Sequence, residues 1–216
     1  DPGASSSKGV REKDVVLAAA KALRDELLVS QRYDVALTRS TDVFIELEDR
    51  VTKARNLGAD LFIALHADAG GKPGTSGASV YTLSPEGEKR VDGARRQNDW
   101  ILDVEVDSTR PEVVNQILAD LVQRETKNQS ARFAQILAAS IGEHGWPTLQ
   151  NTHRKKGLYV LLSPDVPAAL LEMGFITNED DVAAMTSETK RKKLVQGVAH
   201  AIDQFFDSQT RMVAAR

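Results

Sequence analysis

Three residues of this chain, far apart in the sequence, carry side chains suited to metal binding or proton transfer. They are Glu12, His66 and Glu172. His66 and Glu172 each follow an apolar run, and a polar residue that ends such a strand faces the sheet edge where open α/β sheets place their sites. Converging there, an imidazole and two carboxylates would supply the ligands and the base of a metallo-hydrolase.

His66 directly follows the apolar run 61–65, which is typical of a strand buried on both faces. Asp68, two residues further on, is placed to orient one ring nitrogen of a metal-bound imidazole. The alternative is a histidine that ends the strand and bonds a backbone carbonyl. The residue pattern alone leaves both interpretations open.

Glu172 follows the run 168–171, and Gly174 lets the backbone turn sharply after it. Burial beside such a run raises the pKa of a carboxyl group toward the range of a general base. The alternative is a salt bridge with a nearby Lys or Arg. The pattern favours the catalytic role.

Glu12 carries a weaker signal, because a glutamate in the first turn of a helix is stabilised by the helix dipole in any case. Its local pattern therefore favours a structural role. The chain has no cysteine and only four histidines. Any metal must then be held by His and carboxylate side chains.

Composition narrows the class of protein. The chain has 216 residues, 41% hydrophobic and 27% charged, and a formal net charge of −3. The charge gives no basic footprint, so nucleic acid is not an expected partner. No apolar run approaches the roughly 18 residues of a membrane span, so no transmembrane segment is expected. The polar residues 1–7 do not resemble a signal peptide.

The elements that must position these residues alternate along the chain. Apolar periodicity predicts helices at 12–29, 47–57, 111–141 (with a break near 127–130) and 188–206. Short apolar runs predict strands at 33–38, 61–65, 78–83, 158–162 and 168–171. We therefore expect a single α/β domain over 1–216, with a mostly parallel twisted sheet flanked by helices on both faces.

Several segments together resemble the zinc-dependent N-acetylmuramoyl-L-alanine amidases of bacterial cell-wall remodelling. The segments are Asp1-Pro2-Gly3-Ala4, Arg11-Glu12-Lys13, Ala64-Leu65-His66-Ala67-Asp68 and Leu171-Glu172-Met173-Gly174-Phe175. The resemblance implies a zinc ion held by two His and one Glu, with Glu12 and His66 as two of these ligands. It implies that Glu172 is the catalytic glutamate. The bond cleaved would join N-acetylmuramic acid to L-alanine in peptidoglycan.

In that family the first zinc ligand is a His in a Gly-rich turn, after the first strand and just upstream of the segment that matches Asp1–Ala4. The resemblance therefore implies that this strand and this His lie upstream of the sequence. His153 is the remaining histidine in a predicted loop. We expect it to act on the substrate side or behind the ligands, not as a ligand.

Residues 85–130 form a segment of different character, polar over 85–99 and mixed with apolar residues afterwards. Family members of Gram-negative cell division carry a helix here that covers the zinc cleft until an activator protein displaces it. The resemblance thus implies a regulatory insertion, with 86–107 as the blocking part. Gln97 matches the place of a glutamate that can occupy the zinc; Asp99, Asp103 or Glu105 are other candidates. The alternative is a packed surface helix with no regulatory role.

The resemblance places the protein in the periplasm, with peptidoglycan as substrate. Two other functions are compatible with the residues. One is a non-catalytic cell-wall binding or regulatory module that has lost its metal, although such a module has no need of Glu172. The other is a zinc peptidase that cleaves stem peptides.

Overall fold

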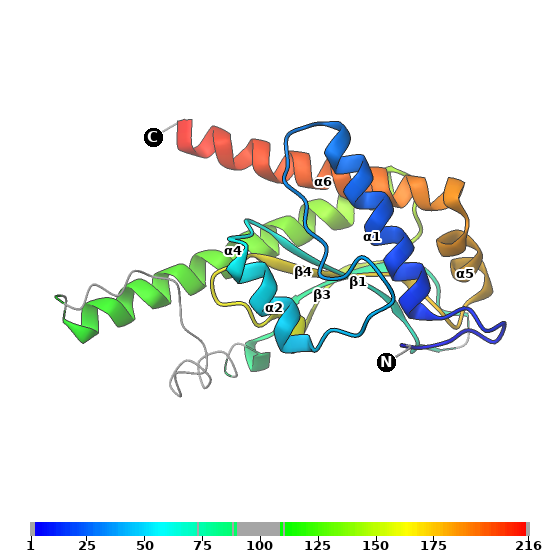
Figure 1. The fold of residues 1–216 in the computed structure, drawn as a ribbon, viewed down its shortest axis with the longest axis horizontal. Helices are drawn as coiled ribbons and strands as arrows, with labels where there is room; N and C mark the ends of the chain where they lie inside the picture. The colour runs from blue at the N-terminus through cyan, green and yellow to red at the C-terminus, as the bar shows by residue number, and fades with distance from the viewer. Residues whose placement is uncertain (1–2, 73, 88, 90–108, 110, 215–216) are drawn as a thin grey trace.

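The structure is a computed structural model that describes residues 3–72, 74–87, 89, 109 and 111–214. Its helices and strands are labelled in Figure 1. In chain order they are α1 (Glu12–Val29), α2 (Leu47–Asn56), β1 (Phe62–Asp68), β2 (Ala78–Leu83), α4 (Glu112–Glu143), β3 (Thr148–Lys156), the 3-10 helix η1 (Tyr159–Leu161), β4 (Ala168–Phe175), α5 (Glu179–Thr186) and α6 (Glu188–Ala214).

The four strands form one sheet in the order β1-β4-β2-β3. β1 runs parallel to β4, and β2 runs parallel to β3. The two pairs meet at β2 and β4, which are antiparallel. The sheet is therefore mixed, with parallel pairing in two of its three neighbouring pairs, and β1 lies at one edge.

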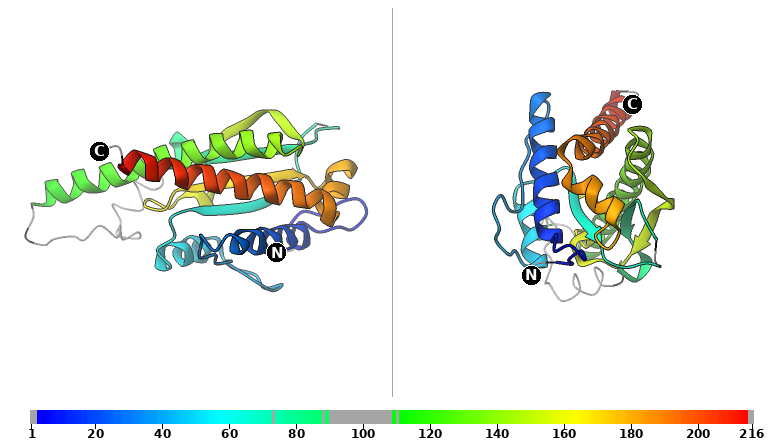
Figure 2. Two further views of the ribbon diagram at one scale, coloured as in Figure 1. Left: turned by 90° about the horizontal axis from the view of Figure 1, so that it is seen from above. Right: turned by 90° about the vertical axis from the view of Figure 1, so that its right-hand side faces the viewer.

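Three helices cover one face of this sheet. The apolar residues of α1 recur every fourth position, which gives the helix one buried stripe: Val15, Ala19, Leu23 and Leu27. This stripe joins α4, α6 and the inward side chains of β1, β2 and β4 in the main hydrophobic core. The two views of Figure 2 show α1, α4 and α6 side by side over the sheet.

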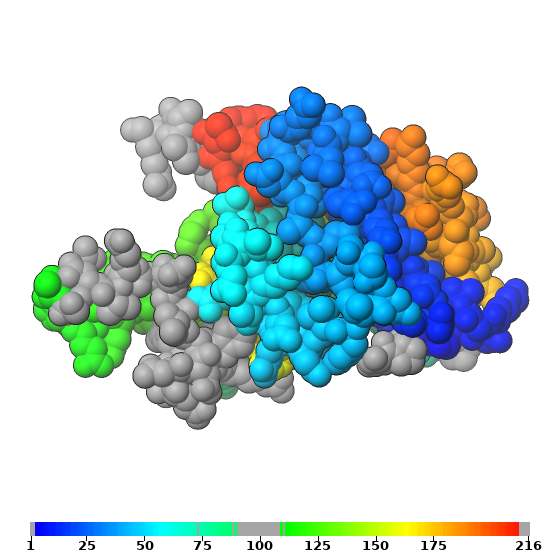
Figure 3. All heavy atoms as spheres, in the orientation of Figure 1, coloured from blue at the N-terminus to red at the C-terminus, as the bar shows by residue number. Residues whose placement is uncertain are grey.

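The opposite face carries a smaller cluster, built around η1 with Leu170, Tyr81 and Ala64 of three neighbouring strands. α2 packs against η1 on this side. In the space-filling view of Figure 3, α1, α2 and the segment that joins them make up most of the face toward the viewer. The expected single α/β domain with helices on both faces of the sheet is thus confirmed.

The detailed element predictions hold for most of the helices but fail at several strands. α4 continues through 127–130 without the predicted break. Residues 33–38 do not pair as a strand, and 158–162 contain η1 instead of a strand. β3 and α5 were not predicted. Among the described residues, no helix is both long and apolar enough to span a membrane.

Candidate active site

His66, Glu172 and Ser79 form one row across three neighbouring strands. His66 pairs with Glu172 in the parallel register of β1 and β4. Ser79 pairs with Glu172 in the antiparallel register of β2 and β4. Side chains of residues directly opposite one another lie on the same face. The row therefore lies on the η1 face, and His66 and Glu172 lie inside their strands, not at the predicted ends.

Glu12 joins this row from the start of α1. Its Oε1 lies 3.0 Å from His66 Nδ1 and accepts the amide of Ala67 at 3.3 Å. Its Oε2 accepts the amide of Ala4 at 3.1 Å. Gly3, at φ 67°, lets the loop pass this closely, because a Cβ there would lie 2.6 Å from Glu12 Oε2. The loop before α1 thus fixes Glu12 against His66.

The hydrogen bonds of Glu12 stabilise its charged form. Burial alone raises the pKa of Glu12, but the bonds with His66, Ala4 and Ala67 outweigh it and lower the pKa below its ordinary value. The side chains of His66 and Glu12 remain 29% and 17% exposed. A charged carboxylate and an imidazole therefore face each other at a site that solvent or a ligand can reach.

The pKa of Glu172 is shifted in the opposite direction from that of Glu12. Burial raises its pKa to about 7; His66 and Lys156 oppose the shift, and the charges of Asp68 and Glu12 add to it. Its Oε2 is buried and has no hydrogen-bond partner among the described residues. None of the ion pairs of those residues involves Glu172, so the salt-bridge alternative has no support. A carboxylate with this pKa can accept a proton at neutral pH.

The structure brings together Glu12, His66 and Glu172, the three residues that the sequence singled out. Two further residues that were expected to act beside them, Asp68 and His153, have other partners. The partner of His66 is Glu12, and Asp68 instead accepts the amide of Gly70 at 2.8 Å. His153 pairs in register with Val80, so it lies on the opposite face from Glu172, where its Nε2 bonds Thr82 Oγ1 at 2.9 Å. His153 is therefore not a group of this site.

Two residues next to the site were not predicted as site residues. Ser79 lies in the segment Ser76-Gly77-Ala78-Ser79-Val80-Tyr81, which belongs to the family resemblance, but its place opposite Glu172 depends on the register of β2. Asp181 is 5% exposed and accepts the amides of Gly77 and Phe175 and the hydroxyl of Ser76. It ties the end of β4 to the loop before β2. The predicted blocking residues Gln97, Asp99, Asp103 and Glu105 lie outside the described residues.

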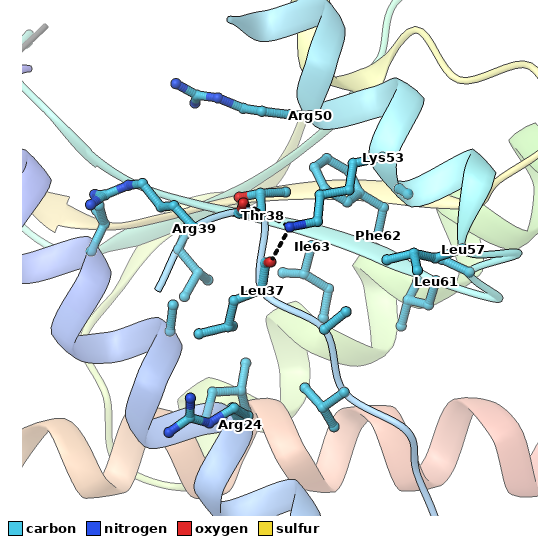
Figure 4. A pocket seen from close by; sticks show the side chains of 18 of the residues that line it. Arg24, Leu37, Thr38, Arg39, Arg50, Lys53, Leu57, Leu61, Phe62 and Ile63 are labelled. Carbon is cyan, nitrogen blue, oxygen red and sulfur yellow. Dashed lines mark hydrogen bonds between the residues drawn. The ribbon is translucent and has the colours of Figure 1, made fainter. Parts of the chain in front are cut away.

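A groove of about 1550 Å³ runs along the outer edge of β1 and reaches Glu12 and His66. α1, α2 and the segment 33–46 form its other walls. Figure 4 shows Leu61, Phe62 and Ile63 on one side and Leu37 and Thr38 on the other. Lys53 Nζ bonds the carbonyl oxygens of Leu37 and Thr38, both at 3.0 Å. Residues 33–38 therefore line the groove without a strand partner among the described residues.

The donor atoms at the inner end of this groove are compatible with zinc. Imidazole nitrogen and carboxylate oxygen are both common zinc ligands, and those of His66 and Glu12 are adjacent. No group of three or more His, Asp or Glu residues that could hold a metal occurs in the described parts of the chain. The described residues therefore offer two adjacent donor groups here, whereas a catalytic zinc site normally takes three ligands from the protein.

Comparisons with known proteins found a matching family and proteins of similar sequence and fold. A family model described as N-acetylmuramoyl-L-alanine amidase matches residues 1–204. The chain is 35% identical over 213 residues to the N-acetylmuramoyl-L-alanine amidase AmiA of Escherichia coli, covering 95% of this chain and 72% of that protein. It is 30% identical to AmiC of Neisseria meningitidis, of which it spans 50%. The CwlD amidase of Clostridioides difficile, solved in complex with the GerS lipoprotein, has a similar fold, with a TM-score of 0.72 at 20% identity over 96% of this chain and 93% of that one.

Proposed function

Because the chain belongs to the N-acetylmuramoyl-L-alanine amidase family, we propose that it hydrolyses the amide bond between N-acetylmuramic acid and L-alanine in peptidoglycan. The observation that carries this proposal is the half-buried carboxyl group of Glu172, with its raised pKa, in one row with His66. Such a carboxylate is matched to proton transfer near neutral pH.

We propose that Glu12 and His66 hold a zinc ion beside Glu172. A bound zinc ion lowers the pKa of its water to about 7 and polarises a carbonyl group. Glu172 takes a proton from the attacking water and passes it to the leaving amine of L-alanine. The buried surroundings of its Oε2 exclude bulk water from this transfer. Glu12, held by the Ala4 and Ala67 amides, stays charged and fixes His66.

The third protein ligand belongs to the proposal as well. Among the described residues, neither the outer edge of β1 nor the segment 33–38 pairs with a strand, and the groove between them would accept one more strand. A strand upstream of Asp1, as the family resemblance implies, would lie there. Its end would bring a His toward Glu12 and His66, since the groove reaches both residues.

The proposed site of action is the periplasm, in cell-wall remodelling during the separation of daughter cells. We further propose that the insertion within 85–130 regulates access to the site and that an activator protein relieves the block. The support is the family resemblance, because 90–108 lie outside the described residues. Deleting 86–107 should raise activity on purified peptidoglycan. Equal or lower activity in a folded variant would count against the block.

The products identify the reaction. Incubation of the zinc-loaded protein with purified peptidoglycan should release stem peptides with a free L-alanine amine, which mass analysis detects. Peptides cut within the stem would indicate a zinc peptidase instead. No cleavage of any bond, with binding to the cell wall retained, would indicate the non-catalytic module.

A further inference from the structure

The hydroxyl of Ser79 is buried and has no hydrogen-bond partner among the described residues, although it lies on the strand next to the proposed base. Ser79 is 1% exposed. Its Oγ is one of three buried side-chain polar atoms without a partner among the described residues, and Glu172 Oε2 is another. Most buried polar atoms in proteins are paired, so each exception asks for an explanation.

The register places these two atoms on neighbouring residues. Ser79 and Glu172 are directly opposite each other in the antiparallel pair of β2 and β4. Side chains in such positions lie on one face, with Cβ atoms roughly 4.5–5.5 Å apart. A serine hydroxyl donates one hydrogen bond, and an ionised carboxylate only accepts. The two unpaired groups are thus complementary once Glu172 is charged.

We propose that Ser79 is a positioning residue for amide hydrolysis. Its hydroxyl donates a hydrogen bond to the Glu172 carboxylate, directly or through one water, and holds that carboxylate toward the attacking water. This inference rests on the proposed function. Among the described residues, no side chain is hydrogen-bonded to the Glu172 carboxyl group, so without this bond its orientation would depend on packing alone.

Thr82 offers a matched control on the same strand. It is 4% exposed, and its hydroxyl bonds His153 on the opposite face of the sheet. Thr82→Val removes a buried hydroxyl at a similar depth but away from Glu172. Ser79→Ala removes the proposed donor, and Ser79→Thr keeps it.

The experiment compares steady-state kinetics of the zinc-loaded wild type and these three variants on soluble peptidoglycan fragments, together with their thermal unfolding. We expect Ser79→Ala to lower kcat by roughly 10- to 100-fold, the scale of a misoriented catalytic group, with KM unchanged. Ser79→Thr should regain most of the loss, and Thr82→Val should keep wild-type kcat. The Tm of Ser79→Ala should stay close to that of the wild type, because a single hydrogen bond contributes only about 1 kcal/mol to stability.

Two results would overturn the proposal. An unchanged kcat in Ser79→Ala would show that the hydroxyl does not act on Glu172. A raised KM with unchanged kcat would place the hydroxyl on the substrate instead. A wild type that releases no free L-alanine amine would contradict the proposed function itself, and this is a different result from an active wild type with an equally active Ser79→Ala variant.

Discussion

Glu12 and His66 lie 54 residues apart in the chain, yet Glu12 Oε1 and His66 Nδ1 are 3.0 Å from each other. The first turn of α1 supplies one atom and β1 the other. Ala4 and Ala67 donate their backbone amides to the same carboxylate and fix its position. The start of α1 and the strand β1 are therefore joined by two side chains. Their donor atoms, a carboxylate oxygen and an imidazole nitrogen, are of the kinds that bind zinc.

Removing either of these side chains should abolish zinc retention. We expect His66→Ala and Glu12→Ala to bind zinc far more weakly, by more than the roughly 10–100-fold that the loss of an outer-shell partner costs. Elemental analysis of the purified, dialysed proteins measures this. His200→Ala is the control, because His200 is exposed on α6 and bonds Gln204. Zinc content equal to wild type in the Glu12 variant would remove Glu12 from the metal site.

Glu172→Gln should abolish turnover and leave zinc in place. The amide keeps the shape of the side chain but cannot take a proton, and general-base catalysis contributes roughly 10²–10⁴-fold to the rate. The release of free L-alanine amine measures the loss, and elemental analysis checks that zinc remains. Amidase activity close to wild type would show that another group is the base.

The raised pKa of Glu172 also predicts how stability depends on pH in the metal-free protein. The folded state holds this proton up to pH about 7, whereas the unfolded state releases it near 4.5. Between these values the folded state binds more protons, so the carboxyl group lowers the free energy of unfolding as pH rises through this window. The loss amounts to on the order of 3 kcal/mol at most by pH 8, from about 2.5 pKa units at 1.36 kcal/mol each.

Denaturant unfolding of the wild type and Glu172→Gln at pH 4, 6 and 8 tests this. The variant has no titrating group at this position, so its stability relative to the wild type should increase from pH 4 to pH 8. The metal-free state is required, because a bound cation would lower the pKa of a neighbouring carboxyl group. A constant difference between the two proteins would mean that Glu172 has an ordinary pKa in the folded state.

Local patterns were sufficient to predict the elements that hold the proposed site. The four-residue spacing of Val15, Ala19, Leu23 and Leu27 is a property of α1 alone. The apolar runs before His66 and Glu172 mark β1 and β4 in the same way. The candidate catalytic and ligand residues beside such runs could therefore be placed on one sheet. Their contacts with one another could not be predicted.

The strand predictions that were wrong failed because a strand also requires a pairing partner, which a local sequence pattern does not reveal. β3 is largely polar and half-exposed, and it is a strand because it pairs with β2. Residues 33–38 have strand-like composition but no partner among the described residues. The apolar run at 158–162 forms η1, since periodicity does not separate a short buried strand from a helical turn. The row of Ser79, Glu172 and His66 likewise follows from register, which only the assembled sheet defines.

Asp181 should be the polar side chain near the site whose loss destabilises the fold most. Its carboxylate is buried and accepts hydrogen bonds from Gly77, Phe175 and Ser76 at 2.9, 2.8 and 2.6 Å. Asp181→Ala leaves these buried donors unpaired, at a cost of about 3 kcal/mol or more.

Thermal or denaturant unfolding measures the effect of Asp181→Ala. Asp180→Ala is the control, because Asp180 is exposed on the same turn of α5, and it should stay within about 0.5 kcal/mol of the wild type. The loop before β2 and the end of β4 hold Ser79 and Glu172 in register through this carboxylate, so Asp181→Ala should also lower amidase activity in the fraction that remains folded. Equal stability of the two variants would show that the backbone pairing of β2 with β4 holds this region without Asp181.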